Sequence, residues 1–312
     1  MRIALVHGVD LGADAFSGDR DPEGAIDVAL HEALRARGVP FERPLWSDPA
    51  VDWSAYDLAV VRTVWDYTED RDAFVAWAAR VADLTTIENS ADVLRWNTHK
   101  SYLLELEERG APVVPTAWLG QGDAVDLSDL CSARGWDEVV VKPAVAAGSD
   151  GLVRVGGGAA AHRRAQDAVD ALLAAGDVMV QPFRRRIAEG ELSLVAIEGR
   201  VTHAVRKRPA EGEFRVQGRF GGRYAPEEPA PEAIALAEWI LEALGAPLLF
   251  ARVDLVTADD GTLELGEVEA TEPDLYLEHS EQGTMALVDA ILRRAAGTAH
   301  AGADTGDGTE TT

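Results

Sequence analysis

The chain has 312 residues, 47% of them hydrophobic and 27% charged, which is enough for two or three packed subdomains of a soluble globular protein. Its formal net charge of −25 argues against a surface for nucleic acid or for an anionic membrane, and favours small-molecule partners. The single cysteine, Cys131, excludes an internal disulfide framework. With no signal peptide and no membrane-length apolar run, we expect a cytoplasmic protein, which could form a homo-oligomer.

The first third of the chain alternates short apolar runs with amphipathic segments. The strand-like runs cover residues 2–7, 39–46, 57–62 and 85–90, and the helix-like segments cover residues 23–38 and 71–84. This alternation is typical of a parallel sheet with helices on its faces. We therefore expect residues 1–90 to form an N-terminal βαβ domain.

The stretch RTVWDYTED, residues 62–70, follows the third of these strands. Ligands of parallel sheets collect beyond the carboxyl ends of the strands, so Arg62, Trp65 and Asp66 are candidate substrate contacts. The alternative is a structural connection whose aromatic residues anchor the chain and in which Arg62 pairs with Asp66.

Two lysines precede features that suit a phosphate. Lys100 lies in the first turn of an expected helix, and Lys142 ends a short apolar strand. The small residues after Lys142, among them Gly148, Ser149 and Gly151, let backbone N–H groups approach a phosphate closely. No Gly-Lys-Ser/Thr follows, so this is not a Walker loop. A plain β-hairpin with a glycine-rich turn is the alternative interpretation.

The second half of the chain begins with a strand that ends in the corner Gln181-Pro182-Phe183, followed by a meander with Glu191 at its head. Residues 213–224 are basic and broken by glycines, in a chain that is short of basic residues. Helices are expected at residues 231–245 and 285–297, on either side of an acidic hairpin.

Asp260-Gly261, between two alternating apolar runs, predicts this hairpin. A two-residue or a four-residue loop places Asp254 opposite Glu267. Alternation then puts six side chains on one face of the ribbon: Arg252, Asp254, Val256, Leu265, Glu267 and Glu269.

Three of these six side chains are carboxylates that would repel one another. At roughly 5 Å and an effective dielectric of about 20, each pair costs about 3 kcal/mol, so a cation is expected beside them. Ligands that are all oxygens suit Mg²⁺ better than zinc. The alternative is a solvated acidic hairpin whose charge Arg252 partly neutralises.

The order of these features resembles the ATP-grasp superfamily, over about residues 55–280. Within it, EGEFRVQGRFGGR and GEVEATEP look like loops of the prokaryotic glutathione synthetases. VRTVWDY, RWNTHKSYLLEL, VVVKPAVAAGSDG, HAVRKRP and ARVDLV look closer to the small branch that contains the O-ureido-D-serine cyclo-ligase of cycloserine biosynthesis.

The resemblance implies an α/β fold of the α+β ATP-grasp kind, in which the βαβ domain is followed by two ATP-grasp subdomains that sandwich the nucleotide. We expect the lid subdomain over residues 91–180 and the C-terminal subdomain, with the metal site, over residues 181–297. The tail 298–312 has no apolar periodicity, and we expect it to be disordered.

Carried over position by position, the resemblance implies that Lys100 and Lys142 hold the ATP phosphates. The other implied nucleotide contacts are the flap residues Gly148, Ser149 and Gly151, the adenine-lining Gln181, Pro182 and Phe183, the ribose acceptor Glu191, and Leu265.

The resemblance also implies a metal site and a catalytic set. Asp254, Glu267 and Glu269 stand at the ligand positions for two Mg²⁺ ions, which Mn²⁺ could replace. The family commonly has asparagine at the position of Glu269, which leaves the metal count and the nucleotide affinity of this chain in question. Lys207, Arg215 and Gln217 match positions in the glutathione synthetases that steady the acyl-phosphate and its developing oxyanion, and Gln217 is also a candidate substrate contact.

The implied function is an ATP-dependent carboxylate-amine ligase that acts through an acyl-phosphate on an amino acid or small peptide. A carboxylate attacks the γ-phosphate of ATP, and a nucleophile then displaces phosphate to form an amide or a ring. Two alternatives stay open at this point, a phosphotransferase on the same scaffold and a nucleotide-binding module without chemistry.

Overall fold

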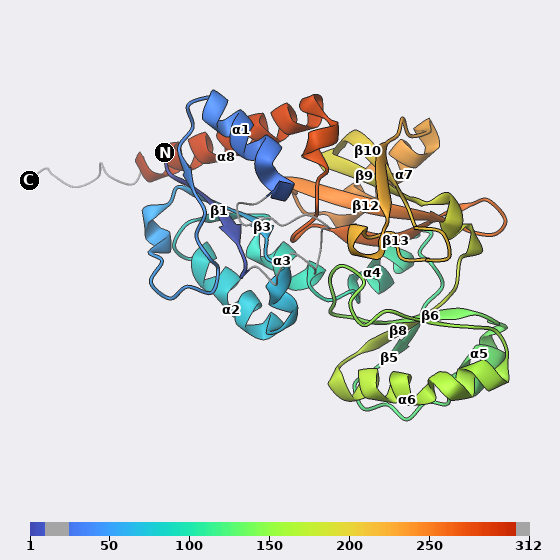
Figure 1. Ribbon diagram of the computed structural model, residues 1–312. Helices are drawn as coiled ribbons and strands as arrows, with labels where there is room; N and C mark the ends of the chain where they lie inside the picture. Colours follow the sequence, from blue (N-terminus) through green and yellow to red (C-terminus); the bar gives the residue numbers. More distant parts are fainter. Residues whose placement is uncertain (10–24, 304–312) are drawn as a thin grey trace, which may run out of the picture.

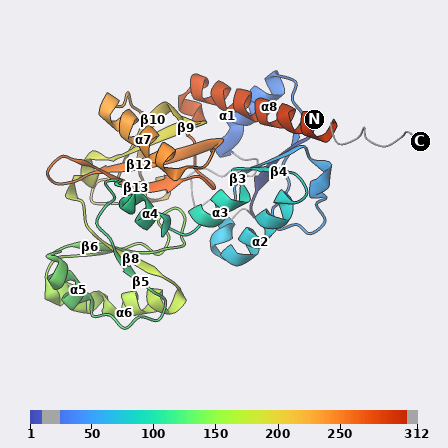
Figure 2. The same ribbon diagram turned by 180° about the vertical axis from the view of Figure 1, so that it is seen from behind.

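The computed structural model describes residues 1–9 and 25–303, which form three sheets with helices around them. Figures 1 and 2 show two sheets side by side and a smaller one set apart, covered by helices α5 (Leu127–Arg134) and α6 (Ala159–Ala175). This arrangement confirms the expected fold class, a parallel sheet followed by two ATP-grasp subdomains. No helix in the described part of the chain is both long and apolar enough to cross a membrane.

The N-terminal sheet is parallel throughout, with the strand order β2-β1-β3-β4. Its elements are β1 (Ile3–His7), α1 (Val28–Ala36), β2 (Phe41–Glu42), β3 (Leu58–Thr63), α2 (Arg71–Ala82) and β4 (Thr86–Glu88). The strand expected at residues 39–46 shrinks to β2 because Pro40 and Pro44 on either side have no backbone N–H for a neighbouring strand.

The small sheet is antiparallel, in the order β5-β8-β6-β7, and we call it and its two helices the lid. Its strands are β5 (Ala117–Leu119), β6 (Val139–Pro143), β7 (Val153–Val155) and β8 (Val178–Pro182). The lid has a core of its own, to which Val141 and Val180 of the sheet and Leu173 of α6 contribute.

The C-terminal sheet has the order β11-β10-β9-β12-β13 and is antiparallel. Its elements are β9 (Glu191–Ile197), β10 (Arg200–Arg208), β11 (Arg223–Pro226), α7 (Pro231–Leu244), β12 (Phe250–Thr257), β13 (Leu263–Glu269) and α8 (Glu281–Ala303). Short 3-10 helices complete the fold: η1 (Ala25–Asp27), η2 (Trp53–Ala55), η3 (Trp65–Thr68), η4 (Arg185–Glu189), η5 (Gly218–Phe220) and η6 (Leu277–His279).

The lid begins later in the chain than residue 91. Helices α3 (Ala91–Asn97) and α4 (Tyr102–Glu108) pack into the core of the C-terminal sheet, where Tyr102 and Leu106 meet Ile240 of α7. The single helix expected around Lys100 is thus two helices. Lys100 lies in the turn between them.

The C-terminal helix ties the two larger sheets together. Ile291 and Leu287 of α8 share one core with Leu34 of α1 and Val205 of β10, and Figures 1 and 2 show α8 alongside α1. Helix α8 runs to Ala303, so the expectation of a disordered tail from residue 298 was wrong for its first residues. The rest of that expected tail, residues 304–312, lies outside the described residues.

Candidate active site

Two adjoining cavities, of about 180 and about 140 Å³, lie where the lid meets the C-terminal sheet. Residues of both subdomains line them jointly: Lys142, Ser149, Leu152, Glu191, Gln217 and Glu267. The larger, which we call the charged cavity, extends to Trp65 of the N-terminal domain. The smaller, the apolar cavity, is flanked by Val114, Pro182 and Phe183.

The chain contains only three lysines, and all three line the charged cavity. Lys100 comes from the turn between α3 and α4, Lys142 from β6 and Lys207 from β10. Lysines in an ordinary soluble protein are spread over its surface. Their concentration in one cavity of a strongly acidic protein indicates a site for a negatively charged ligand.

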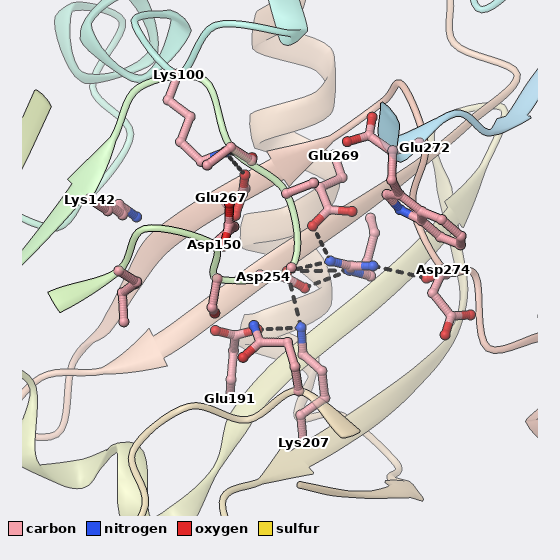
Figure 3. Close-up of a pocket in the computed structure, with 18 of the residues that line it drawn as sticks. Lys100, Lys142, Asp150, Glu191, Lys207, Asp254, Glu267, Glu269, Glu272 and Asp274 are labelled. Atoms are coloured by element: carbon pink, nitrogen blue, oxygen red, sulfur yellow. Dashed lines mark hydrogen bonds and ion pairs between the residues drawn. The ribbon is translucent and has the colours of Figure 1, made fainter. Parts of the chain in front are cut away.

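Lys142 is the lysine whose charge the protein leaves uncompensated. Among residues 1–9 and 25–303, none forms a hydrogen bond or an ion pair with its ammonium group, although Figure 3 shows it beside the cavity acids. Burial lowers the pKa of Lys142, and nearby Lys100 lowers it further against the opposing effect of Glu267. An anionic ligand in the cavity would supply the missing counter-charge.

Lys100 holds the flap, which we define as residues 144–152 between β6 and β7. Its backbone N–H donates to the carbonyl of Ala144 at 2.8 Å, and its Nζ donates to the carbonyl of Ala146 at 2.8 Å. The same Nζ lies 2.7 Å from Oε1 of Glu267 (Figure 3). Burial opposes the charge of Lys100, but Glu267 outweighs burial and raises the pKa of the lysine.

The hairpin has the predicted pairing at its acidic end. Asp254 pairs with Glu267, Arg252 pairs with Glu269, and Gly261 has the positive φ of 93° that the turn requires. Carboxylate oxygens of Asp254, Glu267 and Glu269 all lie within 4.8 Å of one another. The expected cluster of three acids therefore exists.

Protein cations already sit beside this cluster (Figure 3). Arg252 donates to Asp254, with Nη2 to Oδ2 at 2.9 Å, and also to Glu269. Nζ of Lys207 lies 3.2 Å from Oδ2 of Asp254 and forms a second ion pair with Glu191. Arg252 thus compensates part of the acidic charge, as the solvated-hairpin interpretation supposed, although the arginine is buried.

These pairings separate the acids electrostatically. Burial alone would raise the pKa of Asp254, but Arg252 and Lys207 outweigh it and lower that pKa well below its ordinary value. Burial also raises the pKa of Glu269, here to about 7, because Glu267 and Asp254 add to the effect and Arg252 only partly offsets it. The two carboxylates therefore differ in how firmly they stay ionised.

The prediction for Leu265 was wrong. The register shifts by one residue after Asp254, so Leu265 pairs with Leu255, and both point into the core beneath the sheet. The shift is a β-bulge at Gly266, which turns the side chains of β13 between the turn and the bulge to the other face of the ribbon. It is held by segment 112–114, whose Pro112 carbonyl accepts from the N–H of Leu265 at 2.7 Å. Leu265 lines neither cavity.

The expected adenine-side residues lie together. Gln181, Pro182 and Phe183 line the apolar cavity, and Glu191 lies at its boundary with the charged cavity. The Nε2 of Gln181 donates to Oγ1 of Thr116 at 2.8 Å. Flap residues Gly148 and Ser149 line the charged cavity, whereas Gly151, also in the flap, does not reach it.

Arg215 lies on the apolar-cavity side, away from the acids. Its guanidinium donates to Glu213, with Nη2 to Oε2 at 2.7 Å, and it stacks on Phe220 at 3.5 Å from the ring centroid. Gln217, two residues later, lines both cavities. The Oε1 of Gln217 is buried without a hydrogen-bond partner among the described residues, so it is available to a ligand.

Of the three residues expected from the N-terminal domain, only Trp65 lines the charged cavity. Arg62 is 1% exposed and is bound by Asp27, with Nη2 to Oδ1 at 2.8 Å. Asp66 accepts from the N–H of Val9 at 2.8 Å and from Nε1 of Trp46. The substrate prediction for Arg62 and Asp66 was wrong, and so was the alternative that they pair with each other. Both side chains are already bonded to residues from elsewhere in the N-terminal domain.

Two cavity acids were missed by the sequence analysis. Glu272 and Asp274 follow the hairpin and line the charged cavity (Figure 3). Burial raises the pKa of Glu272 to about 8, with Glu269 adding to the shift, and burial raises the pKa of Asp274 to about 6. The signal was present in the sequence, since both acids lie directly after the predicted metal-binding segment in TEPD.

Two family models match the chain. Residues 3–89 match the N-terminal domain of D-cycloserine synthetase DcsG, and residues 121–278, slightly more than half of the chain, match the ATP-grasp domain of prokaryotic glutathione synthetase. The chain is 33% identical over 277 residues to the cycloserine biosynthesis protein DcsG of Streptomyces lavendulae, which covers 85% of this chain and 92% of that protein. The chain belongs to the ATP-grasp ligases.

Further relatives place the ligase within this family. It is 28% identical over 223 residues to the glutathione synthetase of Prochlorococcus marinus (strain MIT 9313), which covers 63% of this chain and 68% of that one. The crystal structure of D-cycloserine synthetase DcsG superposes with a TM-score of 0.81 at 30% identity, over 95% of this chain and 100% of that one. The D-alanine–D-alanine ligase of Bacillus anthracis, with a TM-score of 0.65 at 15% identity, over 95% of this chain and 97% of that one, shares the fold.

Family membership decides between the functions left open by the sequence. The protein is an ATP-dependent carboxylate-amine ligase of the ATP-grasp type. This replaces the two alternative functions, a phosphotransferase and a nucleotide-binding module without chemistry. The model that matches residues 121–278 is an ATP-grasp domain, and the ATP-grasp ligase PsnB, at 17% identity, has a solved structure in complex with Mg and ADP.

Proposed function

We propose that the ligase closes a ring on an amino-acid substrate, as the names of its cycloserine-forming relatives suggest. The observation that carries the site is the convergence of all three lysines of the chain with three carboxylates on one cavity. The match over residues 3–89 supports the substrate class, because this domain contributes Trp65 to the same cavity.

The nucleotide would lie across both cavities. Lys142 and Lys100 would hold its phosphates beneath the flap, at Gly148 and Ser149, since a lysine acts as a compact point charge for phosphate. The adenine would fill the apolar cavity between Pro182 and Phe183. This assignment is supported by the polarity of the two cavities, one charged and one apolar, which meet at Lys142.

The acid cluster suits Mg²⁺. Its donors are carboxylate oxygens within 4.8 Å of one another, which is the ligand type that Mg²⁺ prefers. Asp254, Glu267 and Glu269 would hold two ions, and Mn²⁺ could replace Mg²⁺. When bound, the ions would offset negative charge on the phosphates and the carboxylates. Arg252, bonded to Asp254 and Glu269, would have to share these two acids with the metal.

The chain's own residues would then act mainly by position and charge. The substrate carboxylate oxygen attacks the γ-phosphorus, the bond to the β-phosphate oxygen breaks, and ADP leaves. The nucleophile next attacks the acyl carbon. The bond between this carbon and the phosphate oxygen breaks, and inorganic phosphate leaves. Lys207, held between Glu191 and Asp254, would stabilise charge on the acyl oxygen. Arg215 would add to this effect once its guanidinium leaves Glu213 and turns from the apolar cavity towards the acyl group. Gln217 would offer its unpaired Oε1 to the substrate.

The test is release of ADP with Mg²⁺ and ATP across a panel of amino acids and dipeptides that begins with O-ureido-D-serine. We expect equal amounts of ADP and phosphate, and mass spectrometry should find a product lighter than its single substrate. A product that joins two substrates with loss of water would replace ring closure by intermolecular ligation. A phosphorylated product, or no ADP release with any substrate, would overturn the proposal.

A further inference from the structure

One contact joins two loops that face each other across the mouth of the charged cavity. Nη2 of Arg219 donates to the backbone carbonyl of Gly148 at 2.7 Å. Gly148 belongs to the flap, and Arg219 belongs to residues 209–222 between β10 and β11, which we call the basic loop. The two residues are 71 positions apart and come from different subdomains.

Among the residues that the structure describes, few other contacts fix the tip of the flap over the cavity. Of its nine residues only Ala144 is buried, and Asp150 and Gly151 are exposed. Val145 packs against the core of the N-terminal domain at the start of the flap, so apolar packing contributes little to the position of the tip, residues 147–151. Gly148 and Ser149 both have positive φ, 58° and 66°, a conformation that a serine adopts only at a cost of about 1 kcal/mol or more. Polar contacts must therefore hold the flap.

Those contacts come from two sides. Lys100 binds the carbonyls of Ala144 and Ala146 at the start of the flap, as described above. Arg219 binds the carbonyl of Gly148, further along the flap. The bond from Arg219 thus joins the flap tip to the C-terminal subdomain.

Arg219 is itself held in place for this bond. The guanidinium groups of Arg219 and Arg215 both lie over the ring of Phe220, with Cζ 4.7 Å and 3.5 Å from the ring centroid. At the base of the same turn, the N–H of Gly218 donates to the hydroxyl of Tyr224 at 2.6 Å. These contacts order the turn without a bound ligand, and the turn places Arg219 against the flap.

We propose that Arg219 is a positioning residue that keeps the flap closed over the charged cavity and so sets how long a nucleotide stays bound. The proposal rests on the proposed placement of the phosphates beneath the flap. Gly148 and Ser149 on one loop and Gln217 on the other line the cavity, so breaking the bond between the loops opens its mouth. A guanidinium bond to a carbonyl is charge-assisted and stronger than a neutral hydrogen bond.

The first experiment needs no nucleotide. Hydrogen exchange followed by mass spectrometry should show residues 144–152 exchanging about tenfold faster in Arg219→Gln than in wild type, because a charged hydrogen bond is lost. Peptides of α6 should be unaffected. The matched control is Arg200→Gln, which also removes one arginine of the C-terminal subdomain, at a side chain that is 81% exposed and pairs with Glu238.

The second experiment measures nucleotide release. A fluorescent N-methylanthraniloyl-ADP with Mg²⁺, chased with ATP, should leave Arg219→Gln about tenfold faster than wild type. Arg219→Lys, which keeps one donor, should release it at an intermediate rate, and Arg200→Gln should match wild type. A merely structural role would lower the thermal midpoint without changing the release rate of the folded protein.

The outcomes test the role of Arg219 separately from the proposed nucleotide site. Wild-type flap exchange in Arg219→Gln, or wild-type nucleotide release in the folded variant, overturns the role of Arg219. Failure of the wild-type protein to bind the labelled nucleotide overturns the proposed nucleotide site, while the exchange experiment still decides whether Arg219 holds the flap. If Arg219→Gln does not fold, Arg219→Lys provides both measurements.

Discussion

Lys142 lines the charged cavity, and no described residue forms a hydrogen bond or an ion pair with its ammonium group. A bound phosphate would therefore stabilise the charge of Lys142 more than that of the other cavity cations. Mg-ATP should raise the thermal midpoint of wild type, since a ligand that binds the folded state alone stabilises it. We expect Lys142→Ala to lose most of this shift in differential scanning fluorimetry.

The control for this prediction is Arg163→Ala, an exposed cation of the lid on α6. It should keep the full shift with Mg-ATP. If Lys142→Ala gains as much from Mg-ATP as wild type does, Lys142 does not hold the phosphates. The ligase would then bind nucleotide through other groups.

The pKa of Glu269 predicts a pH-dependent stability for the metal-free protein. Burial raises this pKa from 4.5 to about 7, so the folded state binds the proton more tightly than the unfolded state. Stability from this group therefore falls as pH rises between those values. In EDTA, Glu269→Gln should be more stable than wild type at pH 8, by on the order of 1 to 2 kcal/mol, and equal to it near pH 4.5.

Urea unfolding at the two pH values checks this, with exposed Glu228→Gln as the control. A difference of the same size at both pH values would show that the titration of Glu269 is not its cause. Asp254→Asn should have the opposite sign, a loss of about 3 kcal/mol or more, because Lys207 and Arg252 lose a buried partner.

The acids of the hairpin should also differ in activity. Glu267 belongs to the acid cluster and forms an ion pair with Lys100, so Glu267→Gln should reduce turnover by several orders of magnitude. Glu269→Asn keeps one neutral oxygen ligand and should retain substantial activity with an altered Mg²⁺ or Mn²⁺ optimum. Steady-state ADP release against metal concentration measures both, and wild-type turnover in Glu267→Gln would contradict the metal site.

At the scale of elements, the hairpin β12–β13 combines a metal-site face with a core face, and the bulge at Gly266 separates them. Because Leu265 is fully buried, Leu265→Ala should cost about 2 to 5 kcal/mol in urea unfolding. The rise in thermal midpoint with Mg-ATP should stay as in wild type. If the variant is stable but its thermal midpoint does not rise with Mg-ATP, Leu265 contributes to the nucleotide site after all.

The hairpin also shows how far local sequence determines an element. The turn at Asp260-Gly261 and strict alternation were enough to pair Asp254 with Glu267, because a tight turn fixes the register of the strands beside it. The bulge could not be foreseen from the same residues. It is held by the chain at Pro112, about 150 positions earlier, which no alternation pattern records.

At the scale of the whole molecule, the lid has a separate core, whereas α8 joins the two larger sheets into one. Fewer buried contacts tie the lid down, so we expect it to open locally below the energy of global unfolding. Hydrogen exchange should therefore be faster in β6 and β8 than in β9 and β12. Mg-ATP should slow it in the lid; equal exchange in all four strands, or no effect of Mg-ATP, would argue against this.

The sequence by itself determined the fold class, the hairpin with its three acids and the two lysines proposed for the phosphates. These follow from periodicity, turn residues and the order of short motifs, all of which act between residues close in the chain. The tertiary structure decided which charges are compensated. Arg62 is bound by Asp27 and Asp66 by Trp46, while Lys142 has no such partner among the described residues. Partners of this kind are brought together only by the packing of remote segments, because electrostatic pairing depends on distance in space rather than on position in the chain.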